Sequence, residues 1–386
     1  MSTQATHANS AGSSPNSARS LPHLRPTRLD DYAQLQHLES TYGLLTLDEH
    51  DWRAVWLDNP LRSQLGEKWP FGWVLEEDGG RIVGQLTNVP TRYTFGGRKL
   101  IAVTGRAWVV IPEHRGVALW LMDEYFNQPD VDLFINTTVN GLAVEAFTTF
   151  GSARVPVGDW ENAAFWITGY RGFAKAALRL KNIPLPGLLC HPSGVALRLK
   201  DKVCSRERPK ITTAFAIDCI HTFDSRFDDF WEQYVRSDPK RLLCWRDSRT
   251  LTWHFAGPMR SGHLWIFIAT LRNLLRAYCI LKRQDHPQSG LTRMRLVDYQ
   301  CLDPAEDHLP ALLNAAIARC KPENIHTLEH VGCALPKMAA FDQYAPYRRK
   351  LPAWPFYYHA VDPELNATLG DANVWDPSNF DGDASL

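Results

Sequence analysis

The sequence predicts an α/β protein made of two tandem domains. The chain has 386 residues, which is more than one ordinary hydrophobic core organises. Apolar residues make up 45% of the chain, enough to build two cores. In the first half the patterns follow the order helix, helix, three strands, helix, strand, helix. A similar series follows at an offset of about 190–200 residues.

The first half opens with two short helices and a hairpin. Asp30 is placed to cap a helix whose apolar positions have helical spacing, and a second helix is predicted over 48–57. The segment 72–86 has the alternation and the Asp-Gly-Gly turn of a hairpin. A further turn at Gly96–Gly97 leads into a long apolar strand over 100–110.

A basic, glycine-containing turn follows this strand. Arg115 and Gly116 precede a predicted helix over 117–127, then a strand over 131–137 and a helix over 142–150. A strand, such a turn, a helix and a strand form a unit that can direct backbone N–H groups and a helix N-terminus toward an anion. The sequence therefore predicts a phosphate-binding turn at Arg115.

The second half repeats this order of elements. Trp73 and Trp265 each begin the first strand of a hairpin. The other matched segments are 56–60 with 253–258, 104–110 with 294–300, 117–127 with 307–320, and 131–137 with 325–331. A constant offset is typical of a duplication. The apolar stretch 264–281 is predicted as two strands around Arg272–Asn273, since two arginines interrupt it, and not as a membrane span.

Composition divides the chain further and limits its function. We expect a disordered tail at 1–22, a first domain at 23–197, a basic linker at 198–210, a second domain at 211–362 and an acidic tail at 363–386. The last segment either docks through Trp375 and Phe380 or stays mobile. Lys plus Arg equals Asp plus Glu, at 42 each, so a general nucleic-acid-binding surface is not expected.

The cysteines and histidines do not suggest a metal. The eight cysteines form no CxxC pair, so we interpret them as reduced thiols of a cytoplasmic protein. The histidines show no HExxH spacing, and no metal is expected.

The segment 101–151 resembles the central motif of the GNAT acyltransferase superfamily. The resemblance implies that each half contains a mixed, mostly antiparallel twisted sheet flanked by helices. It implies a splayed strand whose backbone pairs with acetyl-CoA or another acyl-CoA as co-substrate, followed by a turn of pattern Arg/Gln-x-x-Gly-x-Gly/Ala. The matching positions are Trp108, Val109, Val110, Arg115, Gly116, Val117, Ala118, Leu119 and Asn140.

Several positions depart from that pattern. Ala118 replaces the middle glycine and Trp120 replaces a glycine or alanine, so we expect the Trp120 ring to turn away and pack as core. Phe147 occupies the tyrosine position and cannot donate a proton. The nearest carboxylates, Glu113 and Glu145, also fit a solvated surface, and the catalytic residues remain unknown. The alternative is that Arg115 and Gly116 merely begin a surface helix.

Other clusters allow two interpretations. The aromatic stretch 159–171 either walls an acceptor cleft or packs in a core. Arg246 and Asp247 either hold a charged acceptor or form a salt bridge and a helix cap. The second half has Leu302–Asp303–Pro304 in place of the basic turn, so a coenzyme is expected only in the first.

By resemblance, we expect a GNAT-type N-acyltransferase. It would move an acyl group, with acetyl the first expectation, from acyl-CoA to an amine or hydroxyl of a small molecule, a sugar or an envelope precursor by direct attack. An aminoacyl-tRNA donor, which Fem-type transferases use, does not fit the absence of a basic excess. The alternative from another class is a non-catalytic GNAT-like scaffold or ligand-binding protein. The sequence does not define the oligomeric state.

Overall fold

The structure is a computed structural model of the chain and describes most of its residues. Those described are 20–139, 141, 143–156, 159–204, 215–304, 308–333, 345–350 and 356–386, with only the backbone for 159–161 and 332–333. Most of the expected N-terminal tail, Asn140 and the end of the expected linker lie outside the described residues.

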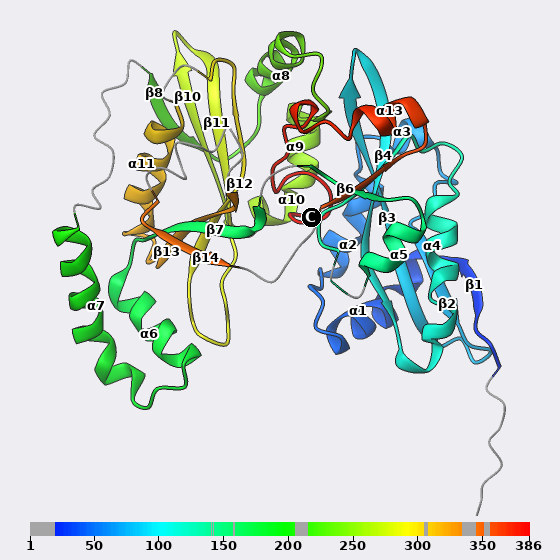
Figure 1. The fold of residues 1–386 in the computed structure, drawn as a ribbon, viewed down its shortest axis with the longest axis horizontal. Helices are drawn as coiled ribbons and strands as arrows, with labels where there is room; N and C mark the ends of the chain where they lie inside the picture. Colours follow the sequence, from blue (N-terminus) through cyan, green and yellow to red (C-terminus); the bar gives the residue numbers. More distant parts are fainter. Residues whose placement is uncertain are drawn as a thin grey trace, which may run out of the picture.

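Two mixed sheets form the centres of two lobes (Figure 1). The first contains β1 (His23–Pro26), β2 (Gly72–Glu76), β3 (Ile82–Phe95), β4 (Arg98–Val110), β5 (Leu133–Asn136), β15 (Tyr357–Ala360) and β6 (Ala153–Arg154) in that order, with β9 (Leu243–Cys244) paired to β3. The second contains β8 (Ala216–Ile220), β10 (Leu264–Leu271), β11 (Leu274–Arg283), β12 (Arg293–Cys301), β13 (Thr327–Cys333), β7 (Asp159–Ile167) and β14 (Tyr347–Lys350).

The two sheets have the same pattern of strand directions. Four neighbouring strands are antiparallel, the fourth pairs in parallel with the fifth, and two further antiparallel strands complete each sheet. The parallel pairs are β4 with β5 and β12 with β13, which are the segments that the sequence matched across the two halves. The predicted fold class of two mixed, mostly antiparallel sheets is confirmed.

The two lobes exchange strands in both directions. β7 follows the last helix of the first half but pairs with β13 and β14 in the second sheet. β15 follows the second half but lies between β5 and β6 in the first sheet. The sheets therefore do not divide the chain at the expected linker: residues 159–203, assigned from sequence mainly to the first domain, belong to the second lobe.

Helices cover both sheets. Those of the first lobe are η1 (Leu29–Asp31), α1 (Tyr32–Thr41), α2 (Glu49–Leu57), α3 (Arg62–Leu65), η2 (Pro112–Val117), α4 (Leu119–Phe126) and α5 (Val144–Thr149). The others are α6 (Tyr170–Leu180), α7 (Pro186–Val203), α8 (Ser225–Ser237), α9 (Ser248–His254), α10 (Ala256–Arg260), α11 (His308–Cys320), α13 (Pro363–Thr368) and η4 (Ala372–Val374). Among the described residues, no helix has the length and apolarity needed to cross a bilayer.

Local signals in the sequence explain many of these boundaries. The side chain of Asp48 accepts a hydrogen bond from the amide of Asp51 and so caps α2. Gly96 and Gly97 have positive φ angles of 58° and 78° at the β3–β4 turn, and Arg272 and Asn273 have 51° and 64° between β10 and β11. The predicted turn at Gly96–Gly97 and the predicted hairpin around Arg272–Asn273 are therefore present. The expected linker differs, because its first part, up to Val203, continues α7.

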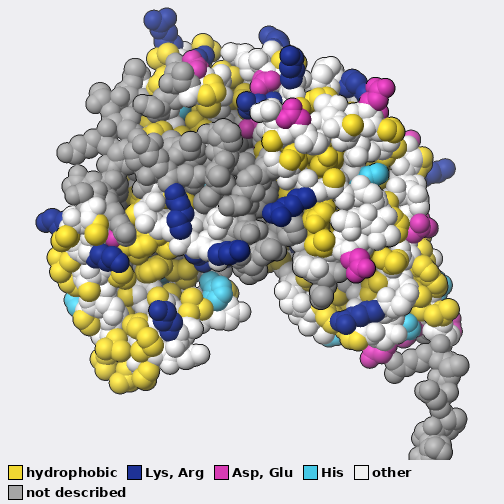
Figure 2. Space-filling view, in the orientation of Figure 1, with side chains coloured by type: hydrophobic (Ala, Val, Ile, Leu, Met, Phe, Trp, Pro, Cys, Tyr) yellow, Lys and Arg dark blue, Asp and Glu magenta, His cyan; other side chains and the backbone are white. Residues whose placement is uncertain are grey.

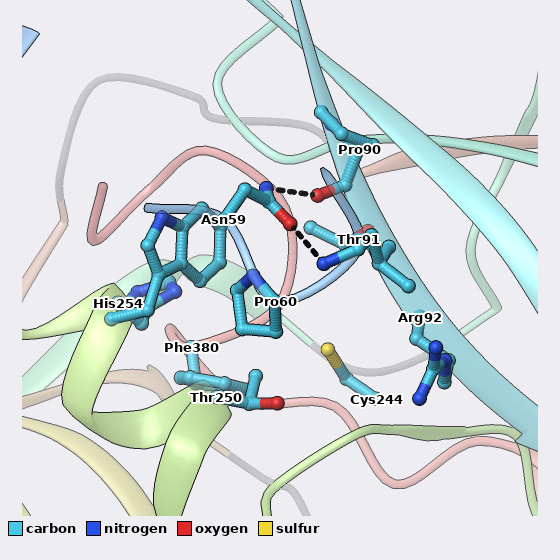
Figure 3. Close-up of a pocket in the computed structure, with 11 residues that line it drawn as sticks. Asn59, Pro60, Pro90, Thr91, Arg92, Cys244, Thr250, His254 and Phe380 are labelled. Carbon is cyan, nitrogen blue, oxygen red and sulfur yellow. Dashed lines mark hydrogen bonds between the residues drawn. The ribbon is translucent and has the colours of Figure 1, made fainter. Parts of the chain in front are cut away.

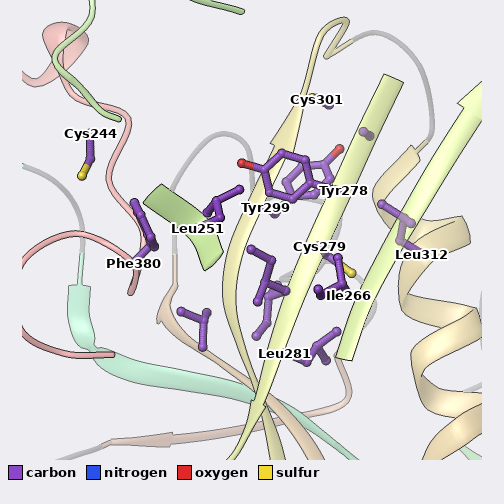
Figure 4. Close-up of a cluster of buried hydrophobic side chains, with 14 of the residues drawn as sticks. Cys244, Leu251, Ile266, Tyr278, Cys279, Leu281, Tyr299, Cys301, Leu312 and Phe380 are labelled. Carbon is purple, nitrogen blue, oxygen red and sulfur yellow. The ribbon is translucent and has the colours of Figure 1, made fainter. Parts of the chain in front are cut away.

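A shared core joins the lobes. One buried apolar cluster contains residues of both sheets, such as Ala102 of β4 and Ile280 of β11, together with Phe380 of the C-terminal segment. Figure 4 shows part of it, with Phe380 and Leu251 beside the strands of the second sheet. Because one cluster spans both sheets, the lobes are packed against each other and not merely tethered.

The C-terminal segment 371–386 lies along the seam between the lobes (Figure 1). Trp375 is 7% exposed and Phe380 2% exposed, so this segment docks through the two rings named above. The carboxylate of Asp383 accepts from the Thr137 amide (3.0 Å) just after β5, while the Ser385 carbonyl accepts from the Lys282 ammonium (2.8 Å) on β11. The segment thus contacts both sheets.

Candidate active site

β4 contains a bulge just before the predicted turn. Gln85 of β3 lies opposite Val109, while Thr87 lies opposite Arg106, so β4 has one residue more than its partner there. Ala107 takes up the extra length with φ 55°, a left-handed conformation that non-glycine residues adopt at a cost of roughly 1 kcal/mol or more. The bulge changes the direction of the strand at Trp108.

The ladder between β4 and β5 ends before the bulge. Their parallel pairing is confined to Ala102 with Leu133 and Val103 with Phe134. Further on, the side-chain oxygen of Asn136 accepts from the Gly105 amide (3.0 Å), so a side chain bridges the strands where a ladder would continue. The two strands therefore share no ladder at Trp108–Val110, the positions that the resemblance assigns to a splayed strand.

Two buried donors occur at this opening. The side-chain amide nitrogen of Asn136 and the indole nitrogen of Trp108 have no hydrogen-bond partner among the described residues. A buried polar group without a partner costs about 1–3 kcal/mol, so such groups suggest a site that a ligand or water completes.

The predicted phosphate-binding turn is a 3₁₀-helix, η2. The His114 amide donates to Ile111 (3.1 Å) and the Ala118 amide to Arg115 (3.2 Å), both through backbone carbonyls. The His114 imidazole, which the sequence did not single out, is buried and lies 2.9 Å from the Glu77 carboxylate, fixing the turn to the β2–β3 hairpin. Arg115 is exposed, and its side chain forms no hydrogen bond or ion pair within the described part of the chain.

α4 begins at once after this turn. Its N-cap, Ala118, provides no side-chain hydrogen bond, and no acid lies in the first turn. The first N–H groups of such a helix have no intrahelical acceptor and carry the positive end of its dipole. Val117 is buried, whereas Leu119 is 47% exposed and points to solvent.

Trp120 does not pack as core. Its side chain is 40% exposed, while Leu121 and Met122, the next residues on α4, are fully buried. The expectation of a core tryptophan is therefore wrong. Only one face of a surface helix contacts the sheet, and on α4 that face is set by Leu121, Met122 and Tyr125.

The groups expected near the thioester show no catalytic acid. Phe147 of α5 is buried and packs edge-to-face on Trp108, with ring centroids 6.3 Å apart. Glu113 and Glu145 are both exposed. Asn140 lies outside the described residues.

Two clefts occupy the seam between the lobes and share Trp253 and His254. The first is lined by Asn59, Pro60, Leu61, Pro90, Thr91, Arg92, Cys244, Thr250, Trp253, His254 and Phe380 (Figure 3). The second is lined by Leu47, Asp51, Ala54, Val55, Trp253, His254, Ala256, Gly257, Pro258, Lys282, Ser385 and Leu386. Neither contains a residue predicted to bind acyl-CoA.

The second cleft contains two titratable groups that the sequence did not reveal. Burial, together with the nearby charges of Arg106 and Arg295, lowers the pKa of Lys282 to about 8. Burial, with Lys282 beside it, holds the pKa of His254 well below its ordinary value, so this imidazole is neutral at pH 7. Its Nε2 lies 2.6 Å from the Ser385 hydroxyl. Perturbed titratable groups in a cleft are typical of functional sites.

Cations of both sheets act electrostatically on Lys282 of the second cleft. Arg106, whose charge acts on Lys282, is two residues before Trp108 on β4. Lys282 lies opposite Arg295 on the neighbouring strand β12.

The other clusters named from sequence are structural. Arg246 is 1% exposed and pairs with Asp298, and Asp247 caps α9 by accepting from the Thr250 amide (2.8 Å). Phe165 and Trp166 of the aromatic stretch are buried on β7. Asp48, His50 and Asp51 lie close enough together to hold a metal ion. Arg260, however, already pairs with both of these acids.

Comparison with known proteins rests on structure alone. No protein-family model and no curated protein matches the chain. A GCN5-related N-acetyltransferase from Anabaena variabilis ATCC 29413 superposes with TM-score 0.53 and 13% identity, over 88% of this chain and 73% of that one. The chain has the GNAT fold.

Two further GNAT-like comparisons cover both lobes. Saccharomyces cerevisiae N-myristoyltransferase, solved with bound myristoyl-CoA and inhibitors, matches with TM-score 0.54 and 11% identity over 90% of this chain and 83% of that one. A conserved protein of unknown function from Enterococcus faecalis V583, named a probable N-acyltransferase, gives TM-score 0.54 and 11% identity over 89% of this chain and 73% of that one.

Proposed function

We propose that this protein transfers an acyl group, acetyl in the first instance, from acyl-CoA to an amine or hydroxyl acceptor. One observation carries the proposal: the bulged edge of β4 opens away from β5 and leads into an exposed arginine and an uncapped helix N-terminus. Solved proteins that share the fold include an N-acetyltransferase and an N-myristoyltransferase, and the latter was solved with bound myristoyl-CoA.

The free edge of β4 can pair with the amide-rich arm of the coenzyme. The Ile111 amide donates to Val83 of β3 (2.9 Å). Because backbone groups alternate in direction along a strand, the N–H and C=O of Val110 point away from β3, toward the opening. These groups would bind the arm, and a neighbouring N–H would polarise the thioester carbonyl as negative charge develops on its oxygen.

The turn and α4 would hold the phosphates. Arg115 supplies an exposed guanidinium, and Gly116 has open space where a Cβ would stand. The first N–H groups of α4 supply hydrogen-bond donors for a phosphate at the N-terminus of this helix. The Leu302–Asp303–Pro304 segment of the second lobe offers no equivalent cation, so we place a single coenzyme on the first lobe.

We assign the acceptor to the second cleft, between the lobes. His254 is neutral and able to accept a proton from an acceptor amine, and Lys282 is able to hold an acidic group of the acceptor. A small molecule, a sugar or an envelope precursor would each fit the chemistry of attack on a thioester.

The first experiment measures coenzyme binding by calorimetry and by thermal melting. Removing Arg115 takes away a charge-assisted phosphate contact, so Arg115→Ala should weaken acetyl-CoA binding about tenfold to a hundredfold. Arg236→Ala, at an exposed position on α8, is the matched control. An unchanged dissociation constant in folded Arg115→Ala would refute the assignment of the turn.

A second readout separates the enzyme from a non-catalytic ligand-binding protein. Thiol release from acetyl-CoA is followed across a panel of amine and sugar acceptors. Binding with no acceptor-dependent release, including with longer acyl-CoAs, would favour the non-catalytic alternative.

A further inference from the structure

α7 has apolar side chains on two opposite faces. Its inner face, with Cys190 and Gly194, packs on α6, and a Cβ on Gly194 would lie 3.1 Å from the Arg171 backbone. Its outer face carries Leu188, Val195, Leu199 and Val203, at spacings of seven, four and four residues. At roughly 100° per residue, Val203 points about 180° away from Gly194.

The outer face is exposed to solvent. Leu188 is 72% exposed and Val203 is 82% exposed. Sixteen large apolar side chains are exposed among the described residues, and seven of them fall within 180–203. Figure 2 shows apolar side chains gathered over this part of the second lobe. A helix that is apolar on both faces normally has both covered, so the outer face is expected to meet a further apolar phase.

The same segment is strongly basic. Residues 170–204 contain seven Lys or Arg and one acid, a net charge of +6 by 7 − 1, although the whole chain is neutral. The one acid, Asp201, is buried and accepts hydrogen bonds from Tyr170 (2.8 Å) and Tyr347 (2.5 Å). Lys200 and Lys202 are exposed and flank the apolar outer face. The exposed charge of this hairpin is therefore wholly positive.

We propose that the α6–α7 hairpin docks on the surface of an anionic lipid bilayer, with the outer face of α7 among the acyl chains. An apolar stripe bordered by lysines is typical of helices that lie in the plane of a membrane interface. Anionic headgroups neutralise the flanking cations, which adds to the apolar contact. A second copy of the chain would instead bring two surfaces of the same charge together. This inference is independent of the acyltransferase proposal.

The test is co-flotation of the full-length protein with vesicles. Phosphatidylcholine vesicles containing about 30% phosphatidylglycerol should bind it, and pure phosphatidylcholine vesicles should bind it far less, with binding reduced by salt. Leu188→Ser with Leu199→Ser should abolish binding. The control is Leu274→Ser, at a similarly exposed leucine (61%) in the β10–β11 hairpin.

A second variant tests the charges separately. Lys200→Gln with Lys202→Gln keeps the apolar face and should weaken vesicle binding about thirtyfold, since each lysine near an anionic surface contributes roughly 1 kcal/mol. The residues replaced in the two double variants are all exposed, so each variant should melt near the temperature of the wild type. Such melting temperatures would confirm that the variants are folded.

Three results would overturn the proposal. One is no binding to anionic vesicles, and another is equal binding to both compositions. The third is that light scattering shows a dimer, that the two serine substitutions dissociate it, and that the protein does not bind vesicles. That result would assign the outer face of α7 to a second copy of the chain.

Discussion

The guanidinium of Arg246 donates from Nε to the carboxylate of Asp298 at 2.9 Å in the shared core of the two lobes. Its Nη2 lies 3.5 Å from a carboxylate oxygen of Asp381 in the C-terminal segment. All three side chains are almost fully buried. Burial disfavours the charge of Arg246, but the two acids outweigh it and raise the pKa of this guanidinium, so it stays charged. One cation therefore connects the second sheet to the segment that fills the seam.

Removing this cation should destabilise the protein strongly. Arg246→Met leaves two buried carboxylates without their main counter-charge, which costs about 3–5 kcal/mol in denaturant unfolding at pH 7. The control is Arg236→Met, which breaks an exposed pair with Glu232 and should cost less than about 0.5 kcal/mol. Limited proteolysis should also cleave the C-terminal segment sooner in Arg246→Met. Equal stabilities for the two variants would contradict this role.

The strand exchange predicts that neither half folds alone. A fragment 1–210 lacks β15 between β5 and β6, and it carries β7 without β13 and β14. A fragment 211–386 lacks β7. Neither fragment should show a cooperative thermal transition by circular dichroism, while the mixture should recover one. A cooperative transition in either isolated fragment would show that the exchange is dispensable.

Neighbouring residues of α4 should differ sharply in their effect on stability. Trp120 is 40% exposed, so Trp120→Ala should change the free energy of unfolding by less than about 1 kcal/mol. Leu121 is fully buried on the same helix, and Leu121→Ala should cost about 2–5 kcal/mol. Both are measured by urea unfolding. A large loss for Trp120→Ala would restore the core tryptophan that the sequence suggested.

The sequence predicted what depends on neighbouring residues. The helix over 48–57, the turns at Gly96–Gly97 and Arg272–Asn273, and the repeated order of strands are local patterns, and the structure confirms them. The cap expected at Asp30 is wrong, because Asp30 lies inside η1 and the N-cap residue of α1 is Asp31. The exchange of β7 and β15 was not predictable in this way, because alternation identifies a strand but not its partner.

Long-range burial explains the other differences. The acids of 371–386 suggest a solvated tail, yet Asp381 and Asp383 are buried because Arg246 and Thr137 receive them. Lys282 and His254 are ordinary residues in the sequence, and only packing of the two lobes gives them perturbed pKa values. The roles predicted for Trp108–Val110 and Arg115 stay predictions, although the bulge and the splayed edge fit them.

Lys282 should be a residue that lowers stability and supports activity. Its pKa is about 8 in the folded protein against an ordinary 10.5, so below pH 8 the folded state holds a buried charge. Between pH 8 and 10.5 the unfolded state binds more protons, and this lysine makes stability rise with pH. Lys282→Met should therefore stabilise the protein at pH 7 by up to about 3 kcal/mol, and the gain should shrink toward pH 10.5.

The same variant tests the acceptor assignment. If Lys282 holds the acceptor, Lys282→Met should lower kcat/KM for the acceptor and leave acetyl-CoA affinity unchanged, since the proposed coenzyme site does not include Lys282. Lys240→Met, at an exposed lysine, is the control for both readouts. A variant that is more stable and fully active would remove Lys282 from the site and leave it as a buried charge of the seam. A variant less stable at pH 7 would contradict the depressed pKa itself.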